Sequence, residues 1–334
     1  MSLPTLDASR FTCGPEAGRL KFAHELVECL KEYGFVKLAN HGVSVEAINS
    51  IFQWSKRFFD LPLETRMRIA YKGGLAPLRG YSYVGQEVIS RITPTEMESE
   101  GAKDRKENLD LGPPTDQEFP NCWLPESDFP KFRESMESYY TLCQEISLFL
   151  LHALEIGLDL PKGSFTDRCT PAASELRLNH YPITHPPKSE TGKAYRAFPH
   201  TDIGVITLLF QDREGGLEFE DRKNPGSFLP ALSQDSTDLI VNVADTLERW
   251  TNGVLKAGLH QVTISESMVD KTHGNIPQRF SAVFFLKGSA RKSAGPLPDF
   301  VSLVQPAKYD EITALEYLQR RHRLLYDNFE QSIG

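Results

Sequence analysis

The sequence predicts a mainly β protein with flanking helices, built around a jelly-roll core. Helical spacing of apolar residues dominates the first half of the chain, whereas short β-prone runs divided by turns fill about 174–287. Short strands in such succession are typical of an antiparallel sandwich or barrel. A last helix is predicted at about 310–327, and the chain lacks the glycine pattern of a Rossmann fold.

Apolar residues at helical spacing predict three helices before the strand-rich centre. The first covers about 18–33, and the second carries its apolar face from Ile48 to Phe59 and stops near Pro62. The third spans about 129–158. We expect these helices to pack on the outside of the β core.

The predicted strands are short and lie mostly in the second half of the chain. Residues 72–120 are rich in glycine, proline and charge and predict a long loop system, in which 85–108 form either a lid or a solvated loop. The clearest β-prone runs are 35–38, 80–84, 176–181, 203–210, 217–219, 239–243, 261–264 and 280–286.

The 334 residues are expected to form one integrated structural unit. Its N-terminal region, 1–120, is mixed and largely helical, and 121–334 form the jelly-roll core with its packing helices.

Composition excludes several classes of partner. The formal net charge is −8 and the pI is about 5.7, which disfavours binding to nucleic acid. No apolar run is long enough for a transmembrane helix, and the N-terminus does not resemble a signal peptide. The five cysteines are scattered without a CxxC pair, which predicts reduced thiols and a cytoplasmic protein. The sequence specifies no oligomeric state.

A candidate metal site lies in the strand-rich part. If 198–204 form a strand, His200 and Asp202 project from the same face. His260 begins another β-prone run and is a candidate third ligand. Two imidazoles and one carboxylate leave adjacent coordination positions open, as Fe(II) oxygenases need to bind O2 together with a co-substrate. A zinc hydrolase is the competing interpretation, but the sequence contains no HExxH motif.

A candidate carboxylate anchor lies further along the chain. On a strand, Arg279 and Ser281 share a face, and a guanidinium beside a hydroxyl suits a carboxylate. On an upstream run Arg177, Asn179 and Tyr181 also share a face. The hydroxyl of Tyr181 is a candidate second donor to the same carboxylate.

The order and spacing of these motifs resemble the 2-oxoglutarate/Fe(II)-dependent dioxygenases of the isopenicillin N synthase-like family. The resemblance covers almost the whole chain. The segments 34–43, 179–182 and 215–217 look like family motifs, and so does 242–245, although the family more often has glycine where Ala244 stands. Within the family, the chain looks closest to fungal members such as thymine hydroxylase and secondary-metabolite oxygenases.

The resemblance implies a distorted double-stranded β-helix that uses Fe(II), 2-oxoglutarate and O2 to oxidise an unactivated C–H bond of a small organic molecule. The metal ligands that it implies are His200, Asp202 and His260. The residues that it implies for 2-oxoglutarate are Arg279, Ser281, Tyr181 and Asn179. No acid–base residue beyond the metal ligands is required.

Five residues are candidates for contact with the substrate, each with a structural alternative. Arg79 and Tyr81 lie in the loop region that often covers the family's active site, although Arg79 is a surface arginine by default. Arg177 faces either an anionic substrate or a structural carboxylate. Phe198 and Phe285 are walls of the pocket or parts of the jelly-roll core.

Two other functions compete with this interpretation. An oxidase of the isopenicillin N synthase type keeps the same triad and the Arg-x-Ser pair but uses no 2-oxoglutarate. A metal-free jelly roll would bind a ligand without turnover, which the intact triad argues against.

Overall fold

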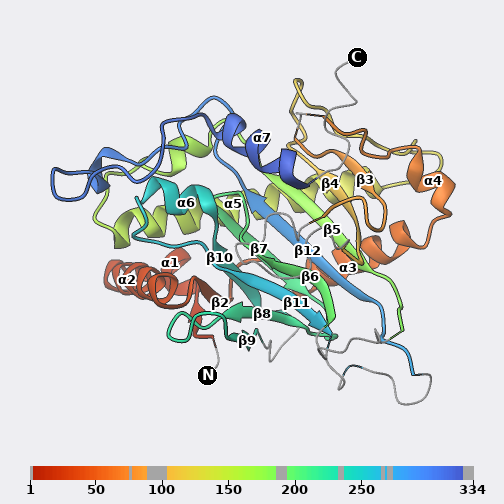
Figure 1. The fold of residues 1–334 in the computed structure, drawn as a ribbon, viewed down its shortest axis with the longest axis horizontal. Coiled ribbons are helices and arrows are strands. Elements are labelled where there is room, and N and C mark those ends of the chain that lie inside the picture. Colours follow the sequence, from red (N-terminus) through yellow and green to blue (C-terminus); the bar gives the residue numbers. More distant parts are fainter. Residues whose placement is uncertain are drawn as a thin grey trace.

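The computed structural model describes residues 3–74, 77–88, 104–185, 194–231, 237–264, 268 and 274–325. Within these residues the strands form two sheets (Figure 1). The larger sheet contains, in spatial order, β1 (Thr5–Asp7), β2 (Phe35–Ala39), β10 (Leu239–Val243), β7 (Ile206–Gln211), β12 (Arg279–Leu286), β5 (Glu175–Tyr181), β4 (Glu107–Leu111) and β3 (Gly80–Ser82). The smaller sheet contains β6 (Ala194–His200), β11 (His260–Ile264), β8 (Leu217–Glu220) and β9 (Phe228–Pro230).

Helices surround this β core. The two longest pack against each other, and each follows an apolar pattern that the sequence predicted. The helix α2 ends at Gly34, whose φ of 73° is left-handed and suits a residue without a side chain. The helix α3 begins after Ser44, whose hydroxyl accepts a hydrogen bond from the amide of Ala47. The helices are α1 (Ser9–Thr12), α2 (Glu16–Tyr33), α3 (Val45–Phe59), α4 (Leu63–Met67), α5 (Phe132–Gly157), α6 (Asp245–Trp250) and α7 (Ala314–Leu325).

The main core lies between the larger sheet and the helices α2, α3 and α5. Phe58 of α3 is fully buried and stacks on Phe132 of α5, with ring planes only 7° apart. Tyr140 of α5 meets Phe284 of β12 edge to face, with ring centroids 5.1 Å apart. These helix contacts cover the face of the larger sheet that points away from the cavity. The opposite face of the sheet lines the site.

The β-rich fold with flanking helices confirms the predicted fold class, and the elements differ from the prediction mainly where strands were short or polar. The strands β4 and β9 and the short helices α1, α4 and α6 were not predicted, β6 was predicted only at its end, and β4 lies in the expected loop system. The N-terminal region supplies β1 to β4, which share the larger sheet with strands of the core. Of the expected lid 85–108, residues 89–103 lie outside the described residues. No helix in the described ranges is long and apolar enough to cross a membrane.

Candidate metal centre and active site

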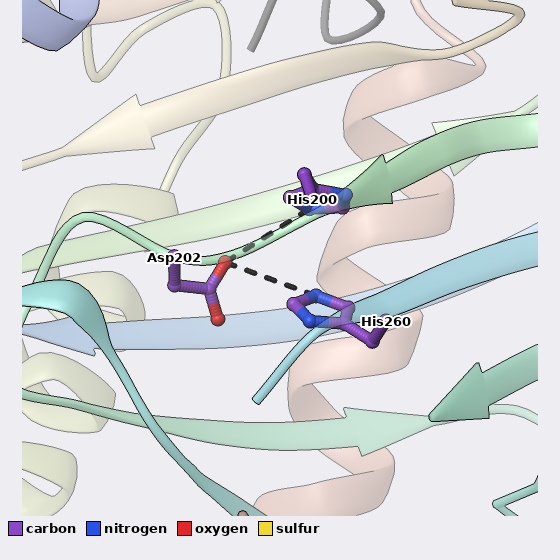
Figure 2. Close-up of side chains that lie close together, drawn as sticks. All are labelled: His200, Asp202 and His260. Carbon is purple, nitrogen blue, oxygen red and sulfur yellow. Dashed lines mark ion pairs between the residues drawn. The ribbon is translucent and has the colours of Figure 1, made fainter. Parts of the chain in front are cut away.

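The structure brings together the three predicted metal ligands (Figure 2). His200 ends β6 and His260 begins β11, and the two residues pair directly across these antiparallel strands. The Oδ1 atom of Asp202 lies 3.9 Å from the Nε2 atom of His200 and 3.8 Å from that of His260. The three ligand atoms all lie within 4.8 Å of one another. Atoms that share an ion at about 2.1 Å are at most about 4.2 Å apart, so a small adjustment closes the site around a metal.

Hydrogen bonds hold each ligand so that one atom faces the centre. The Nδ1–H of His200 donates to the carbonyl of Phe198 at 2.7 Å, and that of His260 donates to the carbonyl of Gly258 at 2.9 Å. Both rings therefore present Nε2 to a metal, because the other nitrogen is occupied.

The carboxylate of Asp202 is held in the same way. Its Oδ2 atom accepts hydrogen bonds from Thr207 at 2.7 Å and from Asn242 at 2.9 Å. The other oxygen, Oδ1, is left for a metal. Thr207 and Asn242 belong to the neighbouring strands β7 and β10, so the larger sheet orients a ligand that follows the smaller one.

The electrostatics of the triad favour a cation at this position. Burial, and then the adjacent His260 imidazole, lower the pKa of His200 to about 3, so this ring is neutral near pH 7. Burial alone would raise the pKa of Asp202, but the two imidazoles and the hydrogen bonds lower it below its ordinary value. A neutral imidazole and an ionised carboxylate are the protonation states that bind a metal.

The local geometry differs from the prediction that His200 and Asp202 share one strand. The strand β6 ends at His200, and Asp202 lies in the turn that follows. The register also shifts within β6, since His260 pairs with His200 but Val262 pairs with Ala197. One extra residue on β6 breaks the alternation of side chains there. The ligands converge because of the turn and the register shift, not because of period-two spacing.

Arg279 offers an anchor for an anion at the other predicted position. It is 1% exposed and lines the cavity that contains the triad. In the described part of the chain its guanidinium donates to neutral acceptors: the carbonyl of Gly215 and the amide oxygen of Gln211, both at 2.9 Å, and more weakly the hydroxyl of Ser281 at 3.4 Å. A buried cation held by neutral groups is well suited to a carboxylate ligand.

The residues facing Arg279 complete this part of the cavity. Arg279 pairs with Tyr181, and Ser281 pairs with Asn179, across β12 and β5. The guanidinium lies 5.0 Å from the centre of the Tyr181 ring, so this ring packs against the cation. The Oδ1 atom of Asn179 is buried without a hydrogen-bond partner among the described residues, while its amide nitrogen donates to Ser281 at 3.3 Å. An unsatisfied polar atom beside a buried guanidinium fits a polar co-substrate.

One cavity joins the triad and the anchor. His200, Asp202 and His260 line it together with Arg279 and Ser281, so a bound metal and the carboxylate of a co-substrate would share one space. Leu217, Val262, Val283 and Phe285 supply apolar walls. At the far end from Arg279 the lining becomes charged, with Arg177 among its members.

The five candidate substrate residues fall into two groups. Phe285 and Arg177 line the cavity, and Arg177 also forms ion pairs with Glu87 and Asp110. The other three do not line it. Phe198 is buried and stacks on Tyr195, because the register shift in β6 turns it away, and this corrects the alternation that placed it beside His200.

The remaining two lie behind the cavity wall. Tyr81 is fully buried, packs its ring on Phe58 and donates its hydroxyl to Glu107. Arg79 is 7% exposed, so the default of a surface arginine is wrong. It pairs with Asp116 at 3.4 Å and with Glu175 at 3.5 Å, and it donates to the carbonyl of Leu78 at 2.7 Å, so it contacts two residues that line the cavity, Glu175 and Leu78.

Several residues of the cavity were missed in the sequence. Lys106, Glu175 and Lys287 sit at strand ends among polar neighbours, where charged residues are ordinarily solvated. His322 comes from the C-terminal helix, which carries no motif. Gln211, which fixes Arg279, ends a strand whose pairing with β12 is visible only in the fold.

Two sequence profiles match the chain. Residues 3–127 match the N-terminal region described as non-haem dioxygenase in morphine synthesis, and residues 173–288 match the 2OG-Fe(II) oxygenase superfamily. The chain belongs to the 2OG-Fe(II) oxygenase superfamily. The second match contains the triad and the residues around Arg279, so the family and the site geometry agree.

The oxygenase is also similar to individual curated proteins and to a solved structure. It is 45% identical to the 2-oxoglutarate-dependent dioxygenase ecdK of Aspergillus rugulosus, over 98% of this chain and 100% of that protein. It is 40% identical to the proline hydroxylase buaE of Petromyces alliaceus, over 96% and 98%. Its fold is similar to that of a Neurospora crassa protein solved in complex with thymine and α-ketoglutarate, which is 2-oxoglutarate (TM-score 0.83, 28% identity, 96% of each chain).

These comparisons confirm the predicted class of enzyme. The protein is a 2-oxoglutarate-dependent oxygenase with a jelly-roll fold, and Fe(II), 2-oxoglutarate and O2 are its cofactor and co-substrates. They support this function over that of an oxidase that uses no 2-oxoglutarate, and over a jelly roll without catalysis.

Proposed function

We propose that the oxygenase oxidises an unactivated C–H bond of a small polar molecule in secondary metabolism, with His200, Asp202 and His260 as the ligands of its iron. The observation that carries this proposal is the convergence of three ligand atoms within 4.8 Å at the wall of a cavity. The names of two similar proteins support the substrate class, because thymine and proline are both small and polar.

We assign Arg279, Ser281, Tyr181 and Asn179 to 2-oxoglutarate. Bound Fe(II), together with 2-oxoglutarate and O2, supplies the oxidant that removes hydrogen from a C–H bond. The fork of Arg279 holds the distal carboxylate of 2-oxoglutarate and so fixes the orientation of this co-substrate. The apolar walls Val262 and Val283 exclude water from the space beside the triad.

We also keep the cytoplasm as the predicted location, because all five cysteines are free thiols. Fractionation of cells that express a tagged full-length chain tests this location, and recovery with a membrane or organelle fraction would contradict it.

Iron binding and succinate release test the proposed function. We expect His200→Ala and Asp202→Ala to abolish Fe(II) binding in anaerobic titrations and 2-oxoglutarate-dependent succinate release. The control is His24→Ala, because His24 is exposed on α2 and does not line the cavity. Full iron binding by both triad variants would contradict the ligand assignment. Oxidation of a substrate without succinate would contradict the use of 2-oxoglutarate.

A further inference from the structure

We propose that the oxygenase takes a zwitterionic substrate of the α-amino-acid type, bound by a mixed-charge wall of the active-site cavity. The charged wall consists of Glu87, Lys106, Glu175, Arg177 and Lys287, all of which are buried and line the cavity. This inference rests on the proposed function, because the same cavity holds the triad.

Glu175, Arg177 and Lys287 of the charged wall lie at the opposite end of the cavity from the anchor for 2-oxoglutarate. Lys106 instead precedes Glu107, which pairs with His180, and reaches Glu87 with its side chain. On β5 the residues that face the cavity run from Tyr181 back to Arg177 and Glu175. Arg177 and Tyr181 are four positions apart on the strand, a distance of about 13 Å. The register repeats this order on β12, where Arg279 pairs with Tyr181 and Val283 pairs with Arg177. A substrate at the charged wall therefore does not compete with 2-oxoglutarate for Arg279.

The groups of the charged wall pair with one another. Arg177 lies 3.1 Å from Glu87, which also accepts a hydrogen bond from Lys106. Lys287 lies 3.0 Å from Glu175. Burial of an ion pair costs several kcal/mol per ion, and apolar side chains of similar size are often at least as stabilising. The fold thus bears a cost at this end of the cavity that the binding of a charged ligand would explain.

The charged wall offers groups of both signs to a ligand. Among the described residues that line the cavity, it supplies three cations and two carboxylates. A carboxylate of the ligand can pair with the cations and an ammonium group can pair with the carboxylates, whereas a ligand of one sign meets like charges on the same wall.

Lys106, Lys287 and His322 have donors or acceptors left for a ligand, which also favours a zwitterion. An ammonium group has three donors, and within the described ranges Lys106 and Lys287 each pair with one carboxylate. His322 of α7 is 2% exposed and lines the same end of the cavity, and its Nδ1 atom has no partner among the described residues. Burial, and then the charge of Lys287, lower the pKa of His322 to about 3, so this ring is a neutral partner. A ligand with a carboxylate and an ammonium group satisfies these atoms.

Matched derivatives test the inference directly. We would measure succinate release with each proteinogenic L-amino acid, its N-acetyl derivative and its amide, alongside calorimetric titration into anaerobic enzyme loaded with Fe(II) and 2-oxoglutarate. At least one free amino acid is expected to bind and to stimulate succinate release, and both of its derivatives to bind at least tenfold more weakly. Equal binding of the derivatives, or no response to any free amino acid, overturns the inference. If Fe(II) and 2-oxoglutarate themselves fail to bind, the proposed function fails instead.

Two variants of the charged wall should shift the selectivity in opposite ways. Lys287→Met removes a partner of the carboxylate, and it should reduce the preference for the free amino acid over the amide at least tenfold. Glu87→Gln removes a partner of the ammonium group, and it should reduce the preference over the N-acetyl derivative instead. The control is Lys56→Met, since Lys56 pairs with Asp60 on an exposed surface. These ratios do not depend on the amount of folded enzyme, and unchanged ratios in both wall variants would refute the assignment.

Discussion

Arg279→Met should weaken the binding of 2-oxoglutarate without removing iron. The wild-type guanidinium is 1% exposed and is held by Gly215 and Gln211, so its position is fixed before the co-substrate arrives. Removal of one partner of a buried, hydrogen-bonded charge pair costs about 2–5 kcal/mol. Since 1.4 kcal/mol is a factor of ten, a loss of about 2–5 kcal/mol raises the KM for 2-oxoglutarate about 30- to 4,000-fold. The KM of Arg279→Lys should lie between those of the wild type and of Arg279→Met, because lysine keeps the charge but loses the two-pronged guanidinium.

The assay for this variant is succinate release as a function of 2-oxoglutarate concentration, with Fe(II) affinity measured in parallel. Arg196→Met is the matched control: Arg196 is also 1% exposed and lies 5.9 Å from the same Tyr181 ring, but it does not line the cavity. We expect Arg196→Met to keep a KM within about threefold of wild type. A folded Arg279→Met enzyme with an unchanged KM would refute the anchor, and an equal rise in both variants would show general damage.

Three further predictions concern support of the iron and stability. Asn242→Ala removes a hydrogen bond to Asp202 and should weaken Fe(II) about 10- to 100-fold in anaerobic titration; unchanged affinity would show that Thr207 alone suffices. Burial alone would raise the pKa of Glu155, but backbone amides lower it, so its ionised form stabilises the fold above pH 4.5 and this contribution is lost as the pH falls. In urea unfolding, Glu155→Gln should therefore have a lower free energy of unfolding than wild type at pH 7, and this difference should become smaller at acidic pH. A difference that does not change with pH would contradict this prediction. Phe58→Ala should cost about 3–5 kcal/mol in the same assay, and a loss below about 1 kcal/mol would contradict the role of this ring in the core.

Alternation along strands predicted much of the site, because it holds wherever pairing is regular. Arg279 and Ser281 face the cavity together, and their partners across β5 are Tyr181 and Asn179, as the two separate patterns indicated. The same rule misplaced Phe198, because an extra residue in β6 shifts the register. A bulge of this kind depends on pairing with β11, which is distant in the sequence, and no local pattern marks it.

The strand β4 was missed because of its amino-acid composition. Its residues, Glu107–Leu111, include two carboxylates and an amide, and such residues are depleted in strands. They are nevertheless all buried, because β4 lies between β3 and β5 and its polar side chains find partners there. A cross-strand ion pair joins Asp110 to Arg177 at 2.6 Å, and no single-strand pattern contains that pair.

The failure of the composition rule at β4 is itself informative about function. A strand with buried charges is not favoured by stability alone, because charged residues are depleted in strands and are ordinarily exposed to solvent. In this oxygenase one such disagreement lies where Asp110 of β4 pairs with Arg177 of β5, and Arg177 lines the cavity. The strands β7 and β10 support Asp202 through Thr207 and Asn242, and β7 also supports Arg279 through Gln211. These two strands follow ordinary patterns and were predicted. If the charged wall binds a zwitterion, as we propose, this departure from ordinary strand composition is explained by a substrate whose own charges replace water as partners of the wall.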